Sequence, residues 1–205
     1  MRYTWAKLRL CRREGKNLFG SAKYSLGQKV VAPGQHGSNM QRYSEYGKLL
    51  RNKQVLKRSY MMSEKQFAKI IKETASKYAK NHNIGHDFAV FQFLERRMDV
   101  IVLRAGFAQT IMQARQMVVH GHFLLNGSKH NVPSTFLKPG DKIELRDKLK
   151  KSALYNSSSK TVAKIPSWIK VDKNAYTIEV LNFPQKGEIE LPADVLKVIE
   201  FYARA

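Results

Sequence analysis

The chain has 205 residues, 43% of them hydrophobic, so it is long enough to bury a substantial core in one domain or two. Its 37 Lys and Arg against 16 Asp and Glu give a net charge of +21, which makes nucleic acid the expected partner, ahead of a membrane surface. No run of about 18 apolar residues occurs, which excludes membrane insertion. A single cysteine, Cys11, excludes an internal disulfide framework and suits a reducing compartment.

The N-terminal third carries most of the charge excess. Residues 1–60 hold 14 Lys or Arg against Glu14 and Glu45, so we expect the partner to be met mainly there. Residues 15–43 are rich in glycine and show little periodic apolar pattern. The sequence therefore predicts irregular, basic backbone in this segment, ordered by its partner.

Two helices are predicted next. In "SEYGKLLRNKQVLKRSY" the leucines share one side of a helix, whereas Arg51 and Arg58 lie on the opposite side. Ser63 and Gln66 have the spacing of a capping box, and apolar residues follow at helical intervals. This pattern predicts a second helix over residues 64–80.

Two short helices and a hairpin are expected after residue 92. Apolar spacing predicts one helix over 93–104, stopped by Gly106, and a Thr110 capping box opens another, ended by Gly121. The Asn-Gly pair of "HFLLNGSKHNV" suits a type I′ turn between strands. Further strands are predicted in "KPGDKIELRD", "AYTIEVLNFP" and "GEIELP", with a loop at 155–160 and a terminal helix from Pro192.

Arginines on the predicted 93–104 helix are candidates for RNA or DNA contact. Arg97 and Arg104 are seven residues apart, which separates them by only about 20° around a helix axis, so they match successive backbone phosphates. The alternative is a solvated charged face on which they pair with Glu95 and Asp99. The global charge excess favours nucleic-acid contact.

Other candidate sites are weaker. His120 and His122 flank a glycine, but zinc needs three or four ligands, and no further ligand cluster accompanies them. Cys11 lies beside two arginines yet has no recognisable base, and no hydrolase, nucleotide-binding or metalloprotease motif is present. The turn "APGQHG", residues 32–37, fits either close contact with phosphate or an ordinary surface turn.

Several segments together resemble bacterial-type ribosomal protein four of the small subunit. They occur in the family's order: "RYTWAKLRLCRREG", "APGQHG", "YGKLLRNKQVLKRSY", "LERRMDVIVLRAGFA", "ARQMVVHGHFLLNG", "VPS", "KPGD" and "IELPADVLKVIEFYAR". The likeness covers nearly the whole chain. Residues 95 to about 150 also resemble the RNA-binding module named after that protein, which occurs in some tyrosyl-tRNA synthetases and pseudouridine synthases.

The resemblance implies an α+β protein in two parts. A basic RNA-binding extension over 1–43 would precede a mostly helical domain over 44–94, which the terminal helix 192–205 completes. Residues 95–186 would form a second domain of two short helices packed on an antiparallel sheet.

The same resemblance implies a non-enzymatic constituent of the small ribosomal subunit without cofactors. As a primary binder of ribosomal RNA it would nucleate assembly of the subunit body and contribute to translational accuracy. It would contact small-subunit protein five and lie near the channel where messenger RNA enters. No import signal is visible, so a cytoplasmic ribosome is expected, with an organelle ribosome as the alternative; repression of its own messenger stays open.

Residues carried over by position would contact RNA through phosphates and groove shape. They are Arg12, Arg13, Lys16, Pro33, Gly34, Gln35, His36, Gly37, Lys53, Lys57, Arg58, Arg97, Arg104, Arg115, Asn126 and Lys138.

One departure from the family bears on metal binding. Some members hold zinc near the N-terminus with four cysteines, one of them three residues before the counterpart of Cys11, where this chain has Leu8. We therefore expect no zinc. Two competing functions remain: an RNA-modifying enzyme that docks through the module, and a free-standing regulator of messenger RNA.

Overall fold

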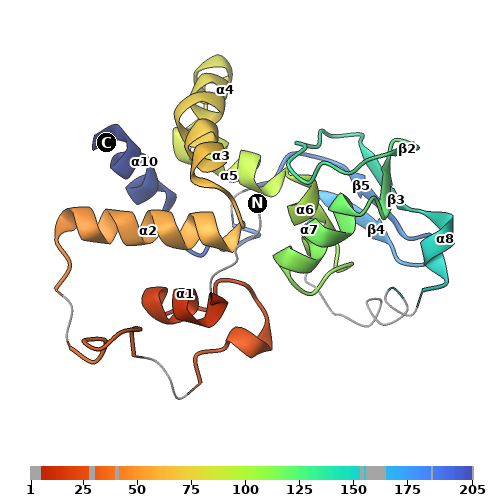
Figure 1. The fold of residues 1–205 in the computed structure, drawn as a ribbon. Coiled ribbons are helices and arrows are strands. Elements are labelled where there is room, and N and C mark those ends of the chain that lie inside the picture. The colour runs from red at the N-terminus through yellow and green to blue at the C-terminus, as the bar shows by residue number, and fades with distance from the viewer. Residues whose placement is uncertain are drawn as a thin grey trace. The chain divides into compact units, whose positions relative to one another are not determined.

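The computed structural model describes residues 6–27, 31–39, 42–152, 155, 165–185 and 187–204. Two compact units divide the chain: a helical unit (Met1–Val90 with Leu191–Ala205) and a sheet unit (Phe91–Glu190). The first is built from helices and the second combines short helices with an antiparallel sheet (Figure 1). The predicted α+β class is confirmed.

The N-terminal segment begins with a helix that the sequence pattern did not reveal. Helix α1 (Lys7–Glu14) ends at Gly15, whose φ of 64° is the left-handed conformation that glycine tolerates best. Beyond it the backbone is irregular, as predicted, apart from the 3-10 turn η1 (Ala22–Tyr24). Phe19 is nevertheless buried, and the Asn17 side chain accepts hydrogen bonds from the amides of Phe19 and Gly20. Part of this segment is thus ordered by the chain itself.

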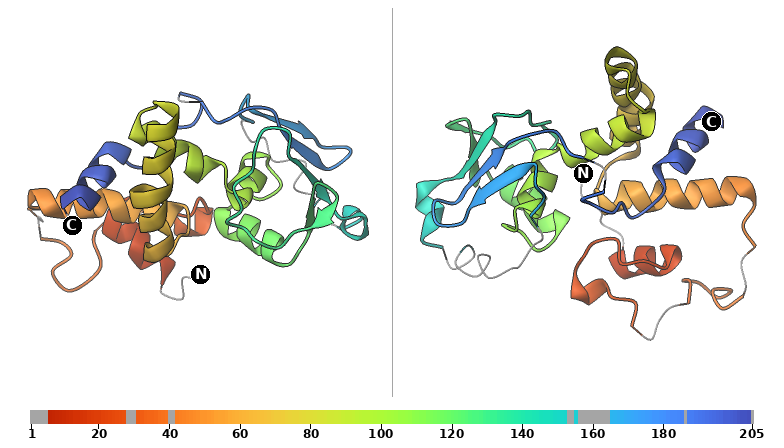
Figure 2. Two further views of the ribbon diagram at one scale, coloured as in Figure 1. Left: turned by 90° about the horizontal axis from the view of Figure 1, so that it is seen from above. Right: turned by 180° about the vertical axis from the view of Figure 1, so that it is seen from behind.

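Helix α2 (Glu45–Ser59) confirms the first predicted helix and packs against α10 (Val195–Arg204). Figure 2 shows the two helices side by side in both of its views. The hydroxyl of Ser44 accepts from the Gly47 amide and opens α2. The terminal helix starts later than predicted, at Val195 and not at Pro192. The Asp194 carboxylate accepts a hydrogen bond from the Leu196 amide and so caps the start of the helix.

The predicted 64–80 helix is present, with one interruption. It comprises α3 (Glu64–Lys69), a π-helical turn η2 (Ile70–Ala75) and α4 (Ser76–His82). Ser63 caps it by accepting from the Gln66 amide at 3.3 Å, as the capping-box spacing predicted. Asn83 ends it with a φ of 50°.

The predicted helix over residues 93–104 is wrong. Helix α5 (His86–Glu95) ends and α6 (Met98–Arg104) begins within that range, and Arg97 between them has extended backbone. Arg97 forms an isolated antiparallel bridge with Phe136, and the Arg96 carbonyl accepts from the Leu137 amide at 2.8 Å. This pairing with a distant segment holds residues 96 and 97 out of helical geometry, which local apolar spacing cannot reveal.

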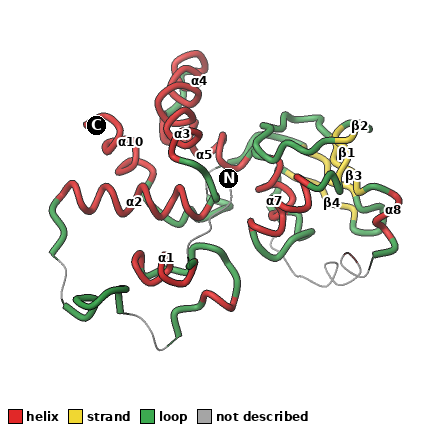
Figure 3. The backbone as a smooth tube through the Cα atoms, viewed as in Figure 1, coloured by secondary structure: helices red, strands yellow, loops and turns green. Residues whose placement is uncertain are grey.

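The described residues of the sheet unit form five antiparallel strands in the order β2-β1-β3-β5-β4. Figure 3 shows strands of this unit in yellow. The strands are β1 (Phe123–Leu125), β2 (Ser128–Lys129), β3 (Lys142–Leu145), β4 (Ile169–Asp172) and β5 (Thr177–Val180). Asn126 and Gly127 join β1 to β2 with φ values of 50° and 80°, which confirms the predicted hairpin turn.

Helix α7 (Ile111–Val119) confirms the second predicted short helix, and Thr110 caps it through the Gln113 amide. Side chains of α6 and α7 share one core with the sheet, including Ile101, Ala114 and Phe123. The short α8 (Asp147–Lys150) follows β3.

The predicted strand in "GEIELP" is wrong. Residues 187–190 form turns and bends, and the second neighbour of β5 in the sheet is the unpredicted β4. The Glu188 carboxylate instead accepts from the amide and hydroxyl of Ser167. Of the predicted loop 155–160, all but Tyr155 lies outside the described residues.

Candidate nucleic-acid interface

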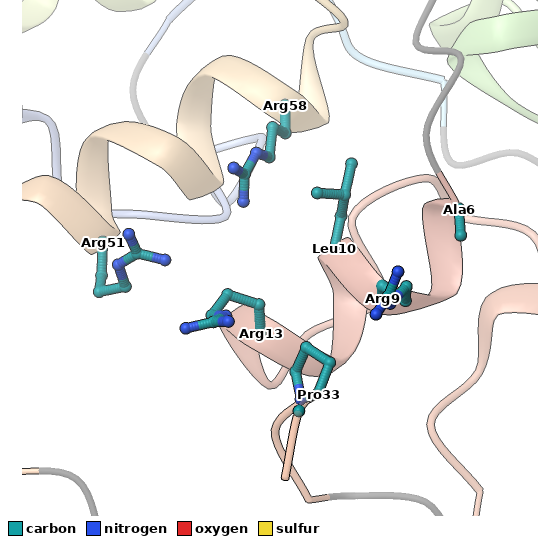
Figure 4. A pocket seen from close by; sticks show the side chains of 8 residues that line it. Ala6, Arg9, Leu10, Arg13, Pro33, Arg51 and Arg58 are labelled. Atoms are coloured by element: carbon teal, nitrogen blue, oxygen red, sulfur yellow. The ribbon is translucent and has the colours of Figure 1, made fainter. Parts of the chain in front are cut away.

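Four arginines line a hollow of about 440 Å³ in the helical unit, which we call the arginine hollow. Two come from successive turns of α1 and two from one side of α2; Figure 4 shows the α2 side chains reaching toward α1. Its lining residues are Ala6, Arg9, Leu10, Arg13, Pro33, Gly34, Arg51 and Arg58.

A buried carboxylate lies beneath the arginine hollow. Oε1 of Glu14 accepts from Nη1 of Arg51 at 2.9 Å and from Nη1 of Arg58 at 2.6 Å. The Glu14 side chain is fully buried, and burial raises its pKa while the two guanidiniums oppose the rise. Four cationic side chains and one carboxylate leave three positive charges in excess, which suits an anion such as a phosphate.

The "APGQHG" turn forms one wall of the arginine hollow. Arg12 fastens the turn by donating from Nε to the Val31 carbonyl at 2.8 Å. A Cβ on Gly37 would lie 1.9 Å from the Ala32 carbonyl oxygen, so the turn closes this tightly only with glycine there. Pro33 and Gly34 line the hollow, whereas Gln35 and His36 are exposed.

Lys53 and Lys57 were predicted to face RNA, but the structure commits them to Glu64. Lys53 Nζ lies 2.9 Å from Oε1, and Lys57 Nζ lies 2.9 Å from Oε2. Lys53 also lies over the Phe201 ring, 4.2 Å from its centroid, and the Tyr202 hydroxyl donates to Glu64 at 2.6 Å. Burial opposes ionisation of Glu64, but these hydrogen bonds prevail and lower its pKa to about 2. The cluster fastens α10 to α2 and α3.

Arg97 is buried in the sheet unit, not exposed. Its Nε and Nη2 donate to both oxygens of Asp99, at 3.0 and 2.7 Å, and Arg115 adds a contact of 3.2 Å. Arg97 is 1% exposed and Asp99 is fully buried. The shared face predicted for Arg97 and Arg104 is therefore wrong, because Arg97 precedes α6 and points into the unit.

Arg104 also pairs with a buried acid. Its Nε and Nη2 donate to the two oxygens of Glu95, each at 2.9 Å. The pairing with Glu95 and Asp99 weighed as the alternative is thus present. Both carboxylates, however, are fully buried and are not part of a solvated face.

The remaining predicted residues occupy two surfaces. Asn126 donates to the Asp141 carboxylate and accepts from the Lys142 amide, so its side chain secures the hairpin turn. The Lys138 side chain is exposed beside that turn. In the helical unit Lys16 is exposed and donates to the Pro192 carbonyl at 3.0 Å.

Sequence reasoning missed Arg9, Arg51 and Glu14 as members of a site. Arg9 and Arg13 are four residues apart and Arg51 and Arg58 seven apart, which are spacings that place each pair on one helix face. The arginine spacing was a usable signal once α1 was known to be a helix. The ion pairs from Glu14 to Arg51 and Arg58, which join α1 to α2, left no local signal.

Metal binding has no support in the part of the chain that the structure describes. No group of three or more His, Cys, Asp or Glu side chains is placed there to hold an ion. Cys11, the sequence's only cysteine, is fully buried, and its neighbour one turn earlier is Leu8. Nδ1 of His122 lies 2.7 Å from the Tyr155 hydroxyl, and burial lowers the pKa of His122.

Among the described helices, none is both long and apolar enough to cross a bilayer.

Fold and surface together define a basic α+β protein that presents arginines to an anionic partner. Residues 2–95 match the family "Ribosomal protein S4/S9 N-terminal domain", and residues 96–143 match the S4 domain. The chain belongs to this family of small-subunit ribosomal proteins, which are structural proteins and not enzymes. The alternative of an RNA-modifying enzyme is thereby rejected.

Relatives match over the whole length. Proteins named "Small ribosomal subunit protein uS4" are 41% identical over 203 residues in Rubrobacter xylanophilus, 39% over 214 in Kosmotoga olearia and 37% over 210 in Thermoanaerobacter sp. (strain X514). Each match covers 99% of this chain and 99% of the relative. The resemblance first noted from short segments is confirmed.

Proposed function

We propose that this protein is a primary binder of small-subunit ribosomal RNA and acts as a structural constituent of that subunit. The observation that carries the proposal is the arginine hollow, which is lined by four arginines, two of them held by one buried carboxylate. Phosphate contacts supply most of the affinity of such a protein and fix its position on the RNA without reading its sequence.

The parts of the chain have different roles in this proposal. The basic extension 1–43 and helix α2 supply the open cations, above all Arg9 and Arg13, while 44–94 with the terminal helix gives them a rigid base. The module within 95–186 presents Lys138 and the hairpin turn to the RNA. Arg97, by contrast, supports the module from inside and does not touch the RNA, because its guanidinium is buried.

Further parts of the proposal rest on the resemblance to the family. In a cytoplasmic ribosome the protein nucleates assembly of the subunit body and contributes to translational accuracy. It does so in contact with small-subunit protein five, near the place where messenger RNA enters. Exposed cations that take no part in internal ion pairs form the surface available for these contacts.

A salt titration of RNA binding tests the central claim. If roughly 6 to 10 phosphates are neutralised, affinity for a small-subunit RNA fragment should fall about 10³- to 10⁵-fold between roughly 50 and 200 mM salt. Filter binding measures this directly, with a double-stranded RNA of unrelated sequence as the competitor. A flat salt response would contradict the proposal.

Assembly and localisation need separate experiments. Reconstitution of small-subunit particles without this protein should stall before later proteins join, and adding it back should restore them. In sucrose gradients most of the protein should sediment with ribosomal particles. A predominantly free pool would instead favour the free-standing messenger regulator.

A further inference from the structure

The guanidiniums of Arg51 and Arg58 are only partly used within the protein. A guanidinium has five N–H donors, and each of these two gives one hydrogen bond, from Nη1 to Oε1 of Glu14. Neither has another partner among the described residues. Their side chains are 28% and 17% exposed, and none of their unused nitrogens is buried away from solvent, so these donors are open to a ligand.

The unused donors share one space. Arg51 and Arg58 both line the arginine hollow, and Arg9 and Arg13 line it from α1 (Figure 4). Arg9 and Arg13 are exposed, and no described residue hydrogen-bonds to their guanidiniums. An anion in the hollow would therefore meet donors from two helices without displacing an existing bond.

We propose that the arginine hollow holds a backbone phosphate of the bound RNA and that Glu14 is a positioning residue, which orients Arg51 and Arg58 toward that phosphate. This inference rests on the proposed binding of ribosomal RNA. Its new content is the location of the phosphate and the role of a carboxylate that does not touch it.

A buried carboxylate assists anion binding when it fixes the donors in advance. Long arginine side chains lose rotamer freedom on binding, and one oxygen of Glu14 has already restrained two of them. The negative charge of Glu14 opposes a phosphate, so the two effects have opposite signs. Orientation prevails in this proposal because the guanidiniums remain in place with their other donors unused.

Because charge repulsion and donor orientation have opposite effects on RNA binding, the variants Glu14→Ala and Glu14→Gln can tell them apart. Both remove a negative charge, which by charge alone strengthens binding to a polyanion. Glu14→Gln keeps an oxygen acceptor for both arginines, whereas Glu14→Ala does not. We expect Glu14→Gln to bind the RNA fragment at least as tightly as the unmodified chain, and Glu14→Ala to bind about tenfold more weakly.

Glu73→Ala is the matched control, because Glu73 is an exposed acid of the same unit on η2. It makes the same change in charge and should bind as tightly as the unmodified chain or more tightly. Equal or tighter binding by Glu14→Ala than by Glu14→Gln would overturn the positioning role.

Thermal unfolding will show whether Glu14→Ala folds. If it does not, a double variant keeps the inference testable. Arg51→Lys with Arg58→Lys preserves charge and a partner for Glu14 but removes the planar forks. Affinity should fall about tenfold, whereas the slope of log affinity against log salt should stay the same, because both charges are kept. The control is Arg204→Lys, an exposed arginine paired with Glu200, which should change neither.

The outcomes separate this inference from the proposed function. If the unmodified chain does not bind the RNA fragment, the proposed function fails. If it binds, and the double lysine variant binds equally well, RNA binding stands but the phosphate lies elsewhere.

Discussion

The arginine hollow and the α6–α7 region of the sheet unit use the same residue types in opposite ways. Both place fully buried carboxylates beneath arginines: Glu14 in the first, Glu95 and Asp99 in the second. Asp99 takes two donors from Arg97, and Glu95 takes two from Arg104, which closes these pairs. Glu14 takes one donor from each of two arginines and leaves the rest available.

The difference teaches that an arginine in a basic protein is not automatically a contact to nucleic acid. One guanidinium that gives two donors to the two oxygens of a carboxylate forms a closed pair that sustains burial, whereas Glu14 receives only one donor from each of its two arginines, which leaves an open arrangement. We infer that the closed pairs stabilise the sheet unit and the open arrangement serves RNA. Four experiments can break or sharpen this distinction.

The largest effect is expected from Asp99→Ala. It leaves the guanidinium of Arg97 buried and unpaired, which should lower the free energy of unfolding by about 3–5 kcal/mol. Urea unfolding of the full chain measures this. Asp147→Ala is the control, since its side chain is 91% exposed beside Lys150, and it should change stability by about 0.5 kcal/mol or less. Equal effects for the two variants would refute the closed-pair interpretation.

The open arginines should affect RNA binding and not stability. Arg9→Gln with Arg13→Gln should reduce the slope of log affinity against log salt by up to about 0.9, for the one phosphate in the arginine hollow. Arg104→Gln should instead destabilise the protein, because it leaves Glu95 buried without its arginine. Filter binding and thermal unfolding of both variants decide the matter. A reversal of the two results would mean that the open and closed assignments are exchanged.

Asn126→Ala should weaken the hairpin by about 1–2 kcal/mol. It removes hydrogen bonds to Asp141 and from the Lys142 amide, and alanine tolerates the φ of 50° poorly. The salt slope of RNA binding should not change, because the amide is engaged within the protein. Weaker RNA binding at unchanged stability would show that the side chain contacts RNA directly.

Glu64 gives the smallest effect, visible as a dependence on pH. Its pKa in the folded state is lowered from 4.5 to about 2, so its stabilising effect is complete above pH 4.5 and is lost as pH falls toward 2. Glu64→Gln should flatten the decline of stability across that window, measured by urea unfolding at successive pH values. A decline as steep as in the unmodified chain would place the acid sensitivity at another group.

Local interactions made much of the fold predictable. Ser63, Thr110 and the Asn126-Gly127 pair act on amides or dihedral angles within a few residues, so their spacing predicted the helix starts and the hairpin that the structure shows. Edges of elements were less predictable. The shift of the last helix start from Pro192 to Val195 depends on which of several nearby residues caps it.

The sequence by itself determined the charge excess, the caps, the hairpin turn and the family, because each is expressed by residue types at short spacings. Tertiary structure alone decided which cations face solvent. The bridge between Arg97 and Phe136 turns one arginine inward, and the hydrogen bonds from Arg51 and Arg58 of α2 to Glu14 of α1 hold two others beside a buried carboxylate. These outcomes depend on contacts between residues far apart in the chain, whose burial fixes the environment of each charge and leaves no periodic signal along the sequence.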